Sequence, residues 1–231
     1  MAKISVMVFA AGLGTRMGAL TRDRPKPLVE VSGKPLIDHA LALVDEINTS
    51  YIVINTHYKH EMLSAHLGDM GVKISPEFPD VLETGGGLKA ALPMLQTNPV
   101  ITLNSDAMWV GSNPLKGLIN HWDGSRMDGL LLCVPPEQTN GYKGLGDFSM
   151  DAQGMLCRQG NLVYSGAQII KTELLDQIDD KVFSLNRLWD IMLKNKTLFG
   201  LSYSGLWCDV GTPEGIIEAE NMILKEKSNE Q

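Results

Sequence analysis

The stretch ISVMVFAAGLGTRMGALTRDRPKPL, residues 4–28, decides the fold of this chain and points to its chemistry. Its first six residues, 4–9, form an apolar run that predicts a buried strand. Small residues follow, and glycine lets the backbone approach an anion closely, where amide N–H groups bind phosphate oxygens. Arg16 and Lys26 come next and supply the positive charge that a polyphosphate needs. The stretch therefore predicts a site for a nucleoside triphosphate.

Two common glycine-rich loops are excluded by their spacing. The dinucleotide fingerprint is G-x-G-x-x-G, whereas Gly12, Gly14 and Gly18 place one residue more between the second and third glycines. The next predicted strand, 51–55, leads into Asn-Thr-His and lacks the acidic residue that binds the ribose of a dinucleotide. The P-loop pattern G-x-x-x-x-G-K-[ST] is absent from the sequence. A nicotinamide oxidoreductase is therefore disfavoured.

The composition restricts the class of protein. A chain of 231 residues with 44% hydrophobic residues can build one large α/β domain. Its net charge of −7 argues against a nucleic-acid partner, because no basic stripe is present to neutralise a phosphate backbone. The three cysteines are widely spaced, so neither a disulfide framework nor a zinc site is expected. The first residues lack a basic-then-apolar leader and no apolar run spans a bilayer, so we expect a cytoplasmic chain without a membrane partner.

Strand-like and helix-like segments alternate along the first part of the chain. The expected strands are 4–9, 51–55, 72–75, 99–104 and 130–134. The expected helices are 35–47, 59–67, 86–95 and 113–121, the third of them capped by Thr84. This alternation predicts an α/β fold with a Rossmann-like, mostly parallel sheet and helices on both faces. Ligands bind such sheets beyond the carboxyl ends of the strands.

From about residue 135, proline, glycine and asparagine become frequent and the predicted strands become shorter. The expected strands here are 148–150, 155–158, 162–170, 197–203 and 206–210. The expected helices are 171–177, 186–194 and a last one that follows a Thr212-Pro213 start and reaches about Lys225. We interpret this part as a lobe packed on the first part of the chain.

Several motifs together resemble those of the sugar-1-phosphate nucleotidyltransferases, also called NDP-sugar pyrophosphorylases. They are A-A-G-x-G-T-R-M at 10–17, P-K-P-L at 25–28, L-E-T-G-G-G at 82–87, L-N-S-D at 103–106, G-D-F at 146–148, S-G at 165–166 and W-C-D-V-G-T at 207–212. The short length, the L-E-T-G-G-G motif and the W-x-D-V-G-T ending are most similar to the N-acetylmuramate-1-phosphate uridylyltransferases of bacterial cell-wall recycling.

The resemblance implies one GT-A-like nucleotidyltransferase domain over 1–231. Residues 1–134 would be mainly the nucleotide-binding part, and 135–206 mainly a small α+β sugar-binding lobe. Residues 207–231 would form a metal-ligand strand and a C-terminal helix. A monomer or a small homo-oligomer is expected.

The implied reaction transfers a nucleotidyl group from a nucleoside triphosphate, with UTP favoured, to a sugar 1-phosphate, with N-acetylmuramate 1-phosphate favoured. A phosphate oxygen of the sugar attacks the α-phosphorus, and pyrophosphate leaves. Because that oxygen is already anionic, catalysis needs positioning and charge stabilisation, with no general base or covalent intermediate. The alternatives are a guanylyl- or thymidylyltransferase acting on a hexose or heptose 1-phosphate, and a non-catalytic sensor of nucleotide sugars.

The resemblance also implies roles for residues at matching positions. Arg16 and Lys26 would be catalytic, Arg16 at the departing pyrophosphate and Lys26 at the α-phosphate or the attacking phosphate. The implied nucleotide-binding residues are Ala10, Ala11, Gly12, Gly14, Thr15, Arg16, Lys26, Glu83, Gly85 and Gly86. The implied sugar-binding residues are Asn104, Asp147, Ser165 and Gly166.

Two carboxylates, Asp106 and Asp209, each end an apolar strand and match the metal ligands of the family. Magnesium prefers hard oxygen ligands and is commonly held by one or two carboxylates plus substrate phosphates, so Mg²⁺ is the expected cofactor. The sequence departs from the family pattern at three positions. Ser105 replaces a glycine, Gly18-Ala19 stands where a proline is frequent, and no lysine follows Phe183.

Overall fold

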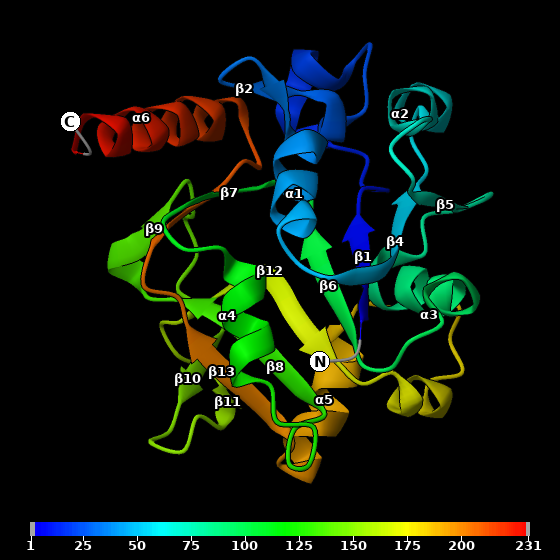
Figure 1. Cartoon of the computed structure of the whole chain (residues 1–231), viewed down its shortest axis with the longest axis vertical. Helices are drawn as coiled ribbons and strands as arrows, with labels where there is room; N and C mark the ends of the chain where they lie inside the picture. The colour runs from blue at the N-terminus through cyan, green and yellow to red at the C-terminus, as the bar shows by residue number, and fades with distance from the viewer. Residues whose placement is uncertain (1–2, 230–231) are drawn as a thin grey trace.

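The computed structural model describes residues 3–229, and its centre is a seven-stranded sheet with the order β13-β8-β12-β6-β1-β4-β5 (Figure 1). The strands are β1 (Ile4–Phe9), β4 (Thr49–Thr56), β5 (Lys73–Pro76), β6 (Val100–Asn104), β8 (Gly129–Val134), β12 (Val163–Ile170) and β13 (Leu198–Ser202). Every neighbouring pair is parallel except the two that β12 makes with β6 and β8. The prediction of a mostly parallel α/β sheet is confirmed.

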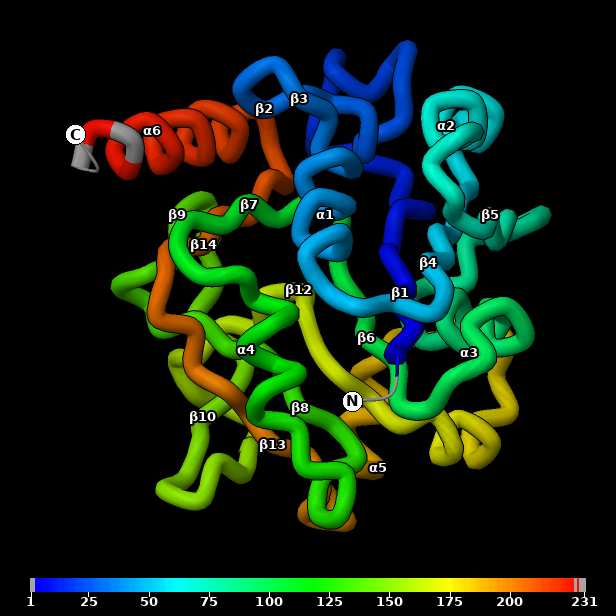
Figure 2. Tube along the Cα trace, viewed as in Figure 1, coloured from blue at the N-terminus to red at the C-terminus, as the bar shows by residue number. Residues whose placement is uncertain are grey.

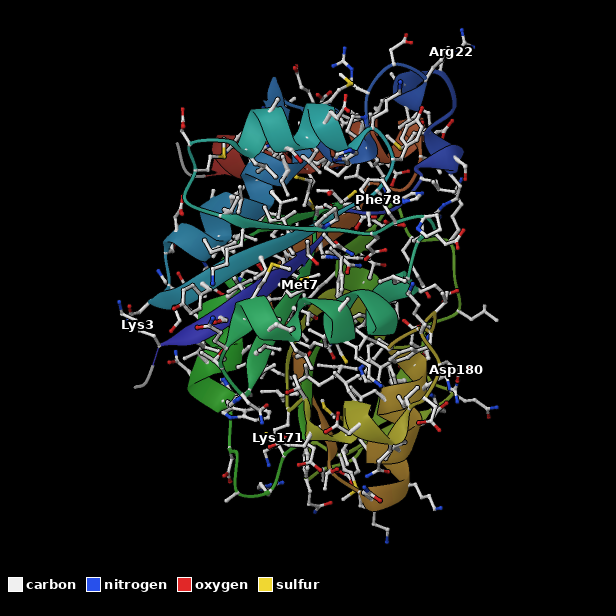
Figure 3. The ribbon with its side chains drawn as sticks, turned by 90° about the vertical axis from the view of Figure 1, so that its right-hand side faces the viewer. Lys3, Met7, Arg22, Phe78, Lys171 and Asp180 are labelled. Atoms are coloured by element: carbon white, nitrogen blue, oxygen red, sulfur yellow. The ribbon has the colours of Figure 1, made fainter. Side chains whose placement is uncertain are left out.

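Helices cover both faces of this sheet, as expected. They are α1 (Leu36–Asp45), α2 (His60–Leu67), α3 (Glu83–Leu95), α4 (Pro114–His121), α5 (Asn186–Asn195) and α6 (Pro213–Asn229). Successive side chains of a strand point to opposite faces, so Val6 and Val8 pack with α1, α2 and α4, whereas Met7 packs with α3 and α5. Figure 3 shows the sheet from the side, with Met7 on the side of β1 that faces α3.

Three small sheets and four 3-10 turns complete the chain. The small sheets are formed by β7 (Ala107–Val110), β14 (Leu206–Asp209) and β9 (Thr139–Asn140), by β10 (Phe148–Met150) and β11 (Leu156–Arg158), and by β2 (Glu30–Val31) and β3 (Lys34–Pro35). The 3-10 turns are η1 (Thr15–Thr21), η2 (Lys26–Leu28), η3 (Pro136–Gln138) and η4 (Glu173–Gln177). Helix α6 lies against η1 and β14 (Figure 2). A third apolar cluster, which includes Met17, Val210 and Met222, packs these elements together.

The structure differs from the sequence-based expectations at three of the expected elements, and it adds the short strands β2, β3, β7 and β9, which were not expected. The segment expected as the helix 171–177 is the short 3-10 turn η4. Thr84 does not cap α3, because the helix begins one residue earlier and the Thr84 hydroxyl accepts a hydrogen bond from Leu185 N at 3.0 Å. Helix α6 continues to Asn229, beyond the expected end near Lys225. The difference at Thr84 follows from a tertiary contact that a local pattern does not encode.

Strands from 1–134 and from 135–206 share the central sheet, so the proposed division into two lobes stays a prediction. The last two residues of the segment 207–231 lie outside the described residues. Within residues 3–229, no helix combines the length and the apolar character needed to cross a bilayer.

Candidate active site

The candidate site lies where the order of the strands changes direction. The chain places β4 on one side of β1 and returns to place β6 on the other, and ligands bind parallel sheets beyond the carboxyl ends of strands at such a point. These three strands run in the same direction in Figure 1. A cavity of about 210 Å³ opens at their ends, lined by residues that include Ala10, Asn55, Glu77 and Asp106. We call it the nucleotide cavity.

The loop after β1 carries free backbone donors, and its residues Ala10, Ala11 and Gly12 line the cavity. Ala10 N donates to Asn55 Oδ1 at 2.7 Å, whereas the N–H groups of residues 11–14 have no hydrogen-bond partner among residues 3–229. Gly14 is left-handed with a φ of 65°, and a Cβ there would lie 2.9 Å from Lys26 Cβ. Glycine is therefore required at 14 both by backbone conformation and by the approach of Lys26. Thr15 and Arg16 follow, both exposed, at the start of η1.

A buried amide–carboxylate pair holds this loop in place, and sequence reasoning missed its acidic member. Asn55 Nδ2 donates to Glu77 Oε1 at 2.7 Å, and Leu82 N donates to Glu77 Oε2 at the same distance. Glu77 is only 1% exposed, so both of its oxygens require such partners. The pair connects the end of β1 to the residue preceding α3. Its signal in the sequence was a carboxylate directly after the short strand expected at 72–75.

The two carboxylates expected to bind metal come together through a strand pair. Asp209 ends β14 opposite Ala107 of β7, and Val210 N donates to Asp106 O at 2.9 Å. Burial, and next the negative charge of Asp106, raise the pKa of Asp209 above its usual value, against the positive charges of Lys26 and Arg16. Two carboxylates that repel each other in this way provide a donor set suited to a divalent cation.

The two cations expected to be catalytic lie beside these carboxylates. Lys26 Nζ donates to Asp106 Oδ2 at 2.6 Å, and the Lys26 side chain is 11% exposed. A Cβ at Gly211 would lie 3.0 Å from both Arg16 Nη2 and Asp209 Oδ2, so the missing side chain of Gly211 leaves room for the guanidinium beside the carboxylate. The structure thus brings together both cations and both carboxylates of the sequence-based prediction.

The residues present fit a metal held partly by substrate. Among residues 3–229, no group of three or more His, Cys, Asp or Glu side chains could enclose a metal ion. The two carboxylates would therefore leave ligand positions for phosphate oxygens. Ser105 does not disturb this arrangement, because its φ is not positive and its hydroxyl donates to Phe9 O at 2.7 Å.

A second cavity, of about 300 Å³, adjoins the first and shares Phe9, Thr84 and Asn104 with it. We call it the sugar cavity. Asp147 lines it and accepts a hydrogen bond from Tyr164 N through Oδ2 at 2.8 Å. Thus two of the residues expected to bind the sugar, Asn104 and Asp147, lie on its wall.

The other two residues expected to bind the sugar, Ser165 and Gly166, are both buried. Gly166 has a φ of 87°, and a Cβ there would lie 2.8 Å from the Asn104 side chain. Ser165 is 1% exposed and its hydroxyl donates to Leu132 O at 2.8 Å. Neither residue lines the sugar cavity. Glycine at 166 is needed to make room for Asn104, and the contact of either residue with a sugar stays a prediction.

Gly85 and Gly86 are also explained by packing. Both amide groups donate to Phe183 O, at 2.9 and 3.0 Å, and a Cβ at Gly85 would overlap the Phe183 ring. Neither glycine lines the nucleotide cavity, whereas Glu83 does. Their expected contact with a nucleobase stays a prediction.

The free amides, the two cations and the two carboxylates lie together at the end of a parallel sheet. This arrangement is that of a nucleotidyltransferase. The family model described as the MobA-like NTP transferase domain matches residues 6–157, and the chain belongs to this family. It is 38% identical to the N-acetylmuramate alpha-1-phosphate uridylyltransferase of Caulobacter vibrioides, over 95% of this chain and 96% of that protein.

A second relative supports this assignment, and a solved structure shares the fold. The enzyme of the same name from Neisseria meningitidis is 32% identical over 94% of this chain and 97% of its own. The inositol-1-phosphate CTP transferase from T. maritima has the same fold, with a TM-score of 0.78 at 14% identity, over 98% of this chain and 97% of that one.

Proposed function

We propose that this chain transfers the uridylyl group of UTP to N-acetylmuramate 1-phosphate, forming UDP-N-acetylmuramate and pyrophosphate with Mg²⁺ as cofactor. The observation that carries the proposal is that the two cavities adjoin and share Asn104. Lys26 and Asp106, which are paired with each other, line the nucleotide cavity close to this boundary. A phosphate ester bound in each cavity would meet its partner at this boundary. The uridylyltransferases with 38% and 32% identity support the choice of UTP and of the sugar.

The chain's own residues would act by binding and neutralising charge. The free amides of residues 11–14 and the Arg16 guanidinium would hold the β- and γ-phosphates, and Arg16 would stabilise the pyrophosphate as it leaves. Lys26 would exchange its contact with Asp106 for a phosphate oxygen at the reacting centre. Asp106 and Asp209 would hold Mg²⁺, which when bound neutralises phosphate charge and polarises the α-phosphorus. No side chain needs to remove a proton, because the attacking oxygen is already anionic.

The remaining assignments concern recognition. Ala10, Thr15, Glu83, Gly85 and Gly86 would contact the nucleotide. Asn104, Asp147, Ser165 and Gly166 would bind the sugar or position the residues that do. We place the enzyme in the cytoplasm, where UTP is made, as a monomer or small homo-oligomer.

A substrate panel tests the proposal. Purified protein is given UTP, GTP, dTTP or CTP with N-acetylmuramate 1-phosphate, N-acetylglucosamine 1-phosphate or mannose 1-phosphate, and pyrophosphate release is measured. The highest kcat/KM is expected for UTP with N-acetylmuramate 1-phosphate. A higher kcat/KM for GTP or dTTP with a hexose or heptose 1-phosphate would replace this proposal by the guanylyl- or thymidylyltransferase.

A second experiment separates an enzyme from a nucleotide-sugar sensor. Lys26→Ala, Asp106→Asn and Asp209→Asn are each expected to lower kcat at least about 100-fold, because each removes a charge from the reacting centre. Chelation by EDTA should stop the wild-type reaction, and added Mg²⁺ should restore it. Circular dichroism and the melting temperature report whether each variant is folded. Full turnover by folded Lys26→Ala or Asp106→Asn would remove the proposed mechanism.

A further inference from the structure

The wall of the sugar cavity carries the positive charge of Arg158, which a neutral sugar would not need. Of the residues that line it within the described part of the chain, Asp147 and Arg158 carry charge. Resting on the function proposed above, we propose that Arg158 binds the carboxylate of the lactyl group of N-acetylmuramate 1-phosphate. Arg158 would thereby select this sugar acid against neutral sugar phosphates.

Neighbouring side chains hold Arg158 in place before any substrate binds. Its Nε and Nη2 both donate to Asp190 Oδ1, at 3.1 and 2.7 Å, and Nη2 also donates to Asn186 O at 3.3 Å. The guanidinium carbon lies 5.0 Å from the centre of the Phe148 ring and 5.8 Å from that of Trp189. A planar cation held by rings and hydrogen bonds loses little conformational entropy on binding.

One nitrogen of the guanidinium remains free for a ligand. Nη1 donates to no group within residues 3–229, whereas the other two nitrogens are engaged. Asp190 is 63% exposed and does not line the cavity, so this pair is a solvent-screened contact that contributes little stability. Arg158 can keep Asp190 on one edge and bind a second carboxylate through Nη1.

Asp147, the other charged residue of the wall, complements this assignment. Its Oδ2 accepts from Tyr164 N, which leaves Oδ1 as an acceptor for a sugar hydroxyl or the N-acetyl N–H. Asp147 would repel a carboxylate, so a sugar acid is oriented with its carboxylate towards Arg158. The two charges thus define both the selectivity and the direction of the sugar.

The test compares two substrates that differ in one charge. N-acetylmuramate 1-phosphate and the methyl ester of its lactyl group are each titrated with saturating UTP, and the ratio of their kcat/KM values is measured. Because a charge-assisted hydrogen bond is stronger than a neutral one, the wild-type enzyme should prefer the acid by about 10- to 100-fold. Arg158→Gln should bring this ratio close to one, with most of the change in KM.

Two controls separate recognition from structure. Arg187 lies on α5, as Asp190 does, but it pairs with Asp180 and does not line the cavity. The variant Arg187→Gln should therefore keep the wild-type ratio. Arg158→Lys retains the charge and should restore part of the preference for the acid. The turnover of the methyl ester by Arg158→Gln reports whether the variant is folded and able to react.

The outcomes distinguish the two proposals. If wild-type enzyme uses N-acetylmuramate 1-phosphate and Arg158→Gln keeps the full preference for the acid, the role of Arg158 is disproved and the proposed function stands. If the wild-type enzyme uses neither muramate substrate but turns over another sugar phosphate, the proposed function itself fails.

Discussion

At the scale of single residues, the candidate site depends on positions where a side chain is missing. Gly14 leaves room for the Lys26 side chain. Gly211 leaves room for the Arg16 guanidinium beside Asp209. The motif around residues 10–17 predicts glycines that let the backbone approach an anion, but it does not predict the contact between Gly14 and Lys26. The second contact could not be predicted either, since Gly211 and Arg16 are far apart in the chain and meet only in the fold.

We expect Gly14→Ala to reduce both stability and turnover. The left-handed conformation costs alanine about 1–2 kcal/mol, and the added Cβ would also contact Lys26 Cβ at 2.9 Å. Gly71→Ala is the control, because Gly71 has a similar φ of 70° and open space around its Cβ position. Urea unfolding and kcat are measured for both. Equal losses in the two variants would contradict a specific contact with Lys26.

The cysteines should differ in reactivity in the native protein. Burial raises the pKa of both Cys133 and Cys208 to about 12, whereas Cys157 is exposed on β11. Because the thiolate is the reactive form, Ellman's reagent at pH 8 should modify Cys157 and leave the other two until the protein unfolds. Cys157→Ser should abolish the native reaction. Rapid modification of two or more thiols in folded protein would be incompatible with this packing.

At the scale of elements, sequence periodicity located the large strands and helices within a few residues. The strand 4–9 and helix α4 are examples, because an apolar run and an Asn-Pro start are local signals. The short strands β7 and β9 exist only because β14 pairs with both of them, so no local pattern predicts them. The capping role expected of Thr84 failed for the same reason, since its partner Leu185 lies 101 residues away.

Asn113 gives α4 a testable start. Its Oδ1 accepts from Leu115 N and Lys116 N, and its Nδ2 donates to Leu43 O at 2.9 Å. Asn113→Ala should lower the free energy of unfolding by about 1–2 kcal/mol, because it removes the cap and leaves a carbonyl unpaired. Asn113→Asp keeps the acceptor and loses only the donor, so urea unfolding should show a smaller loss. A larger loss for aspartate than for alanine would contradict this account.

At the scale of the whole molecule, stability is coupled to pH through a partly buried histidine. Burial lowers the pKa of His39, and the charge of Lys34 acts in the same direction, against the hydrogen bond to Val31 O. As the pH falls through the unfolded value of 6.5, the unfolded chain gains a proton that the folded chain resists. The folded state should therefore lose stability below about pH 6.5.

Replacing His39 tests this coupling. Urea unfolding between pH 7.5 and 5 should show a flatter pH dependence for His39→Gln than for wild type. The control is His121→Gln, at an exposed position whose ring is hydrogen-bonded to Gly117 O of its own helix. It should follow the wild-type curve. Identical slopes for His39→Gln and wild type would show that His39 does not contribute to the acid sensitivity.

Because β14 carries Asp209, the two carboxylates of the proposed reacting centre are synthesised about a hundred residues apart. The triphosphate loop emerges from the exit tunnel earlier still, about 190 residues before Asp209. Under the proposed mechanism, a nascent chain could retain a nucleotide while still being unable to turn it over. A chain that ends before residue 206 would lack Asp209, and the proposed chemistry would begin only once β14 has paired with β7.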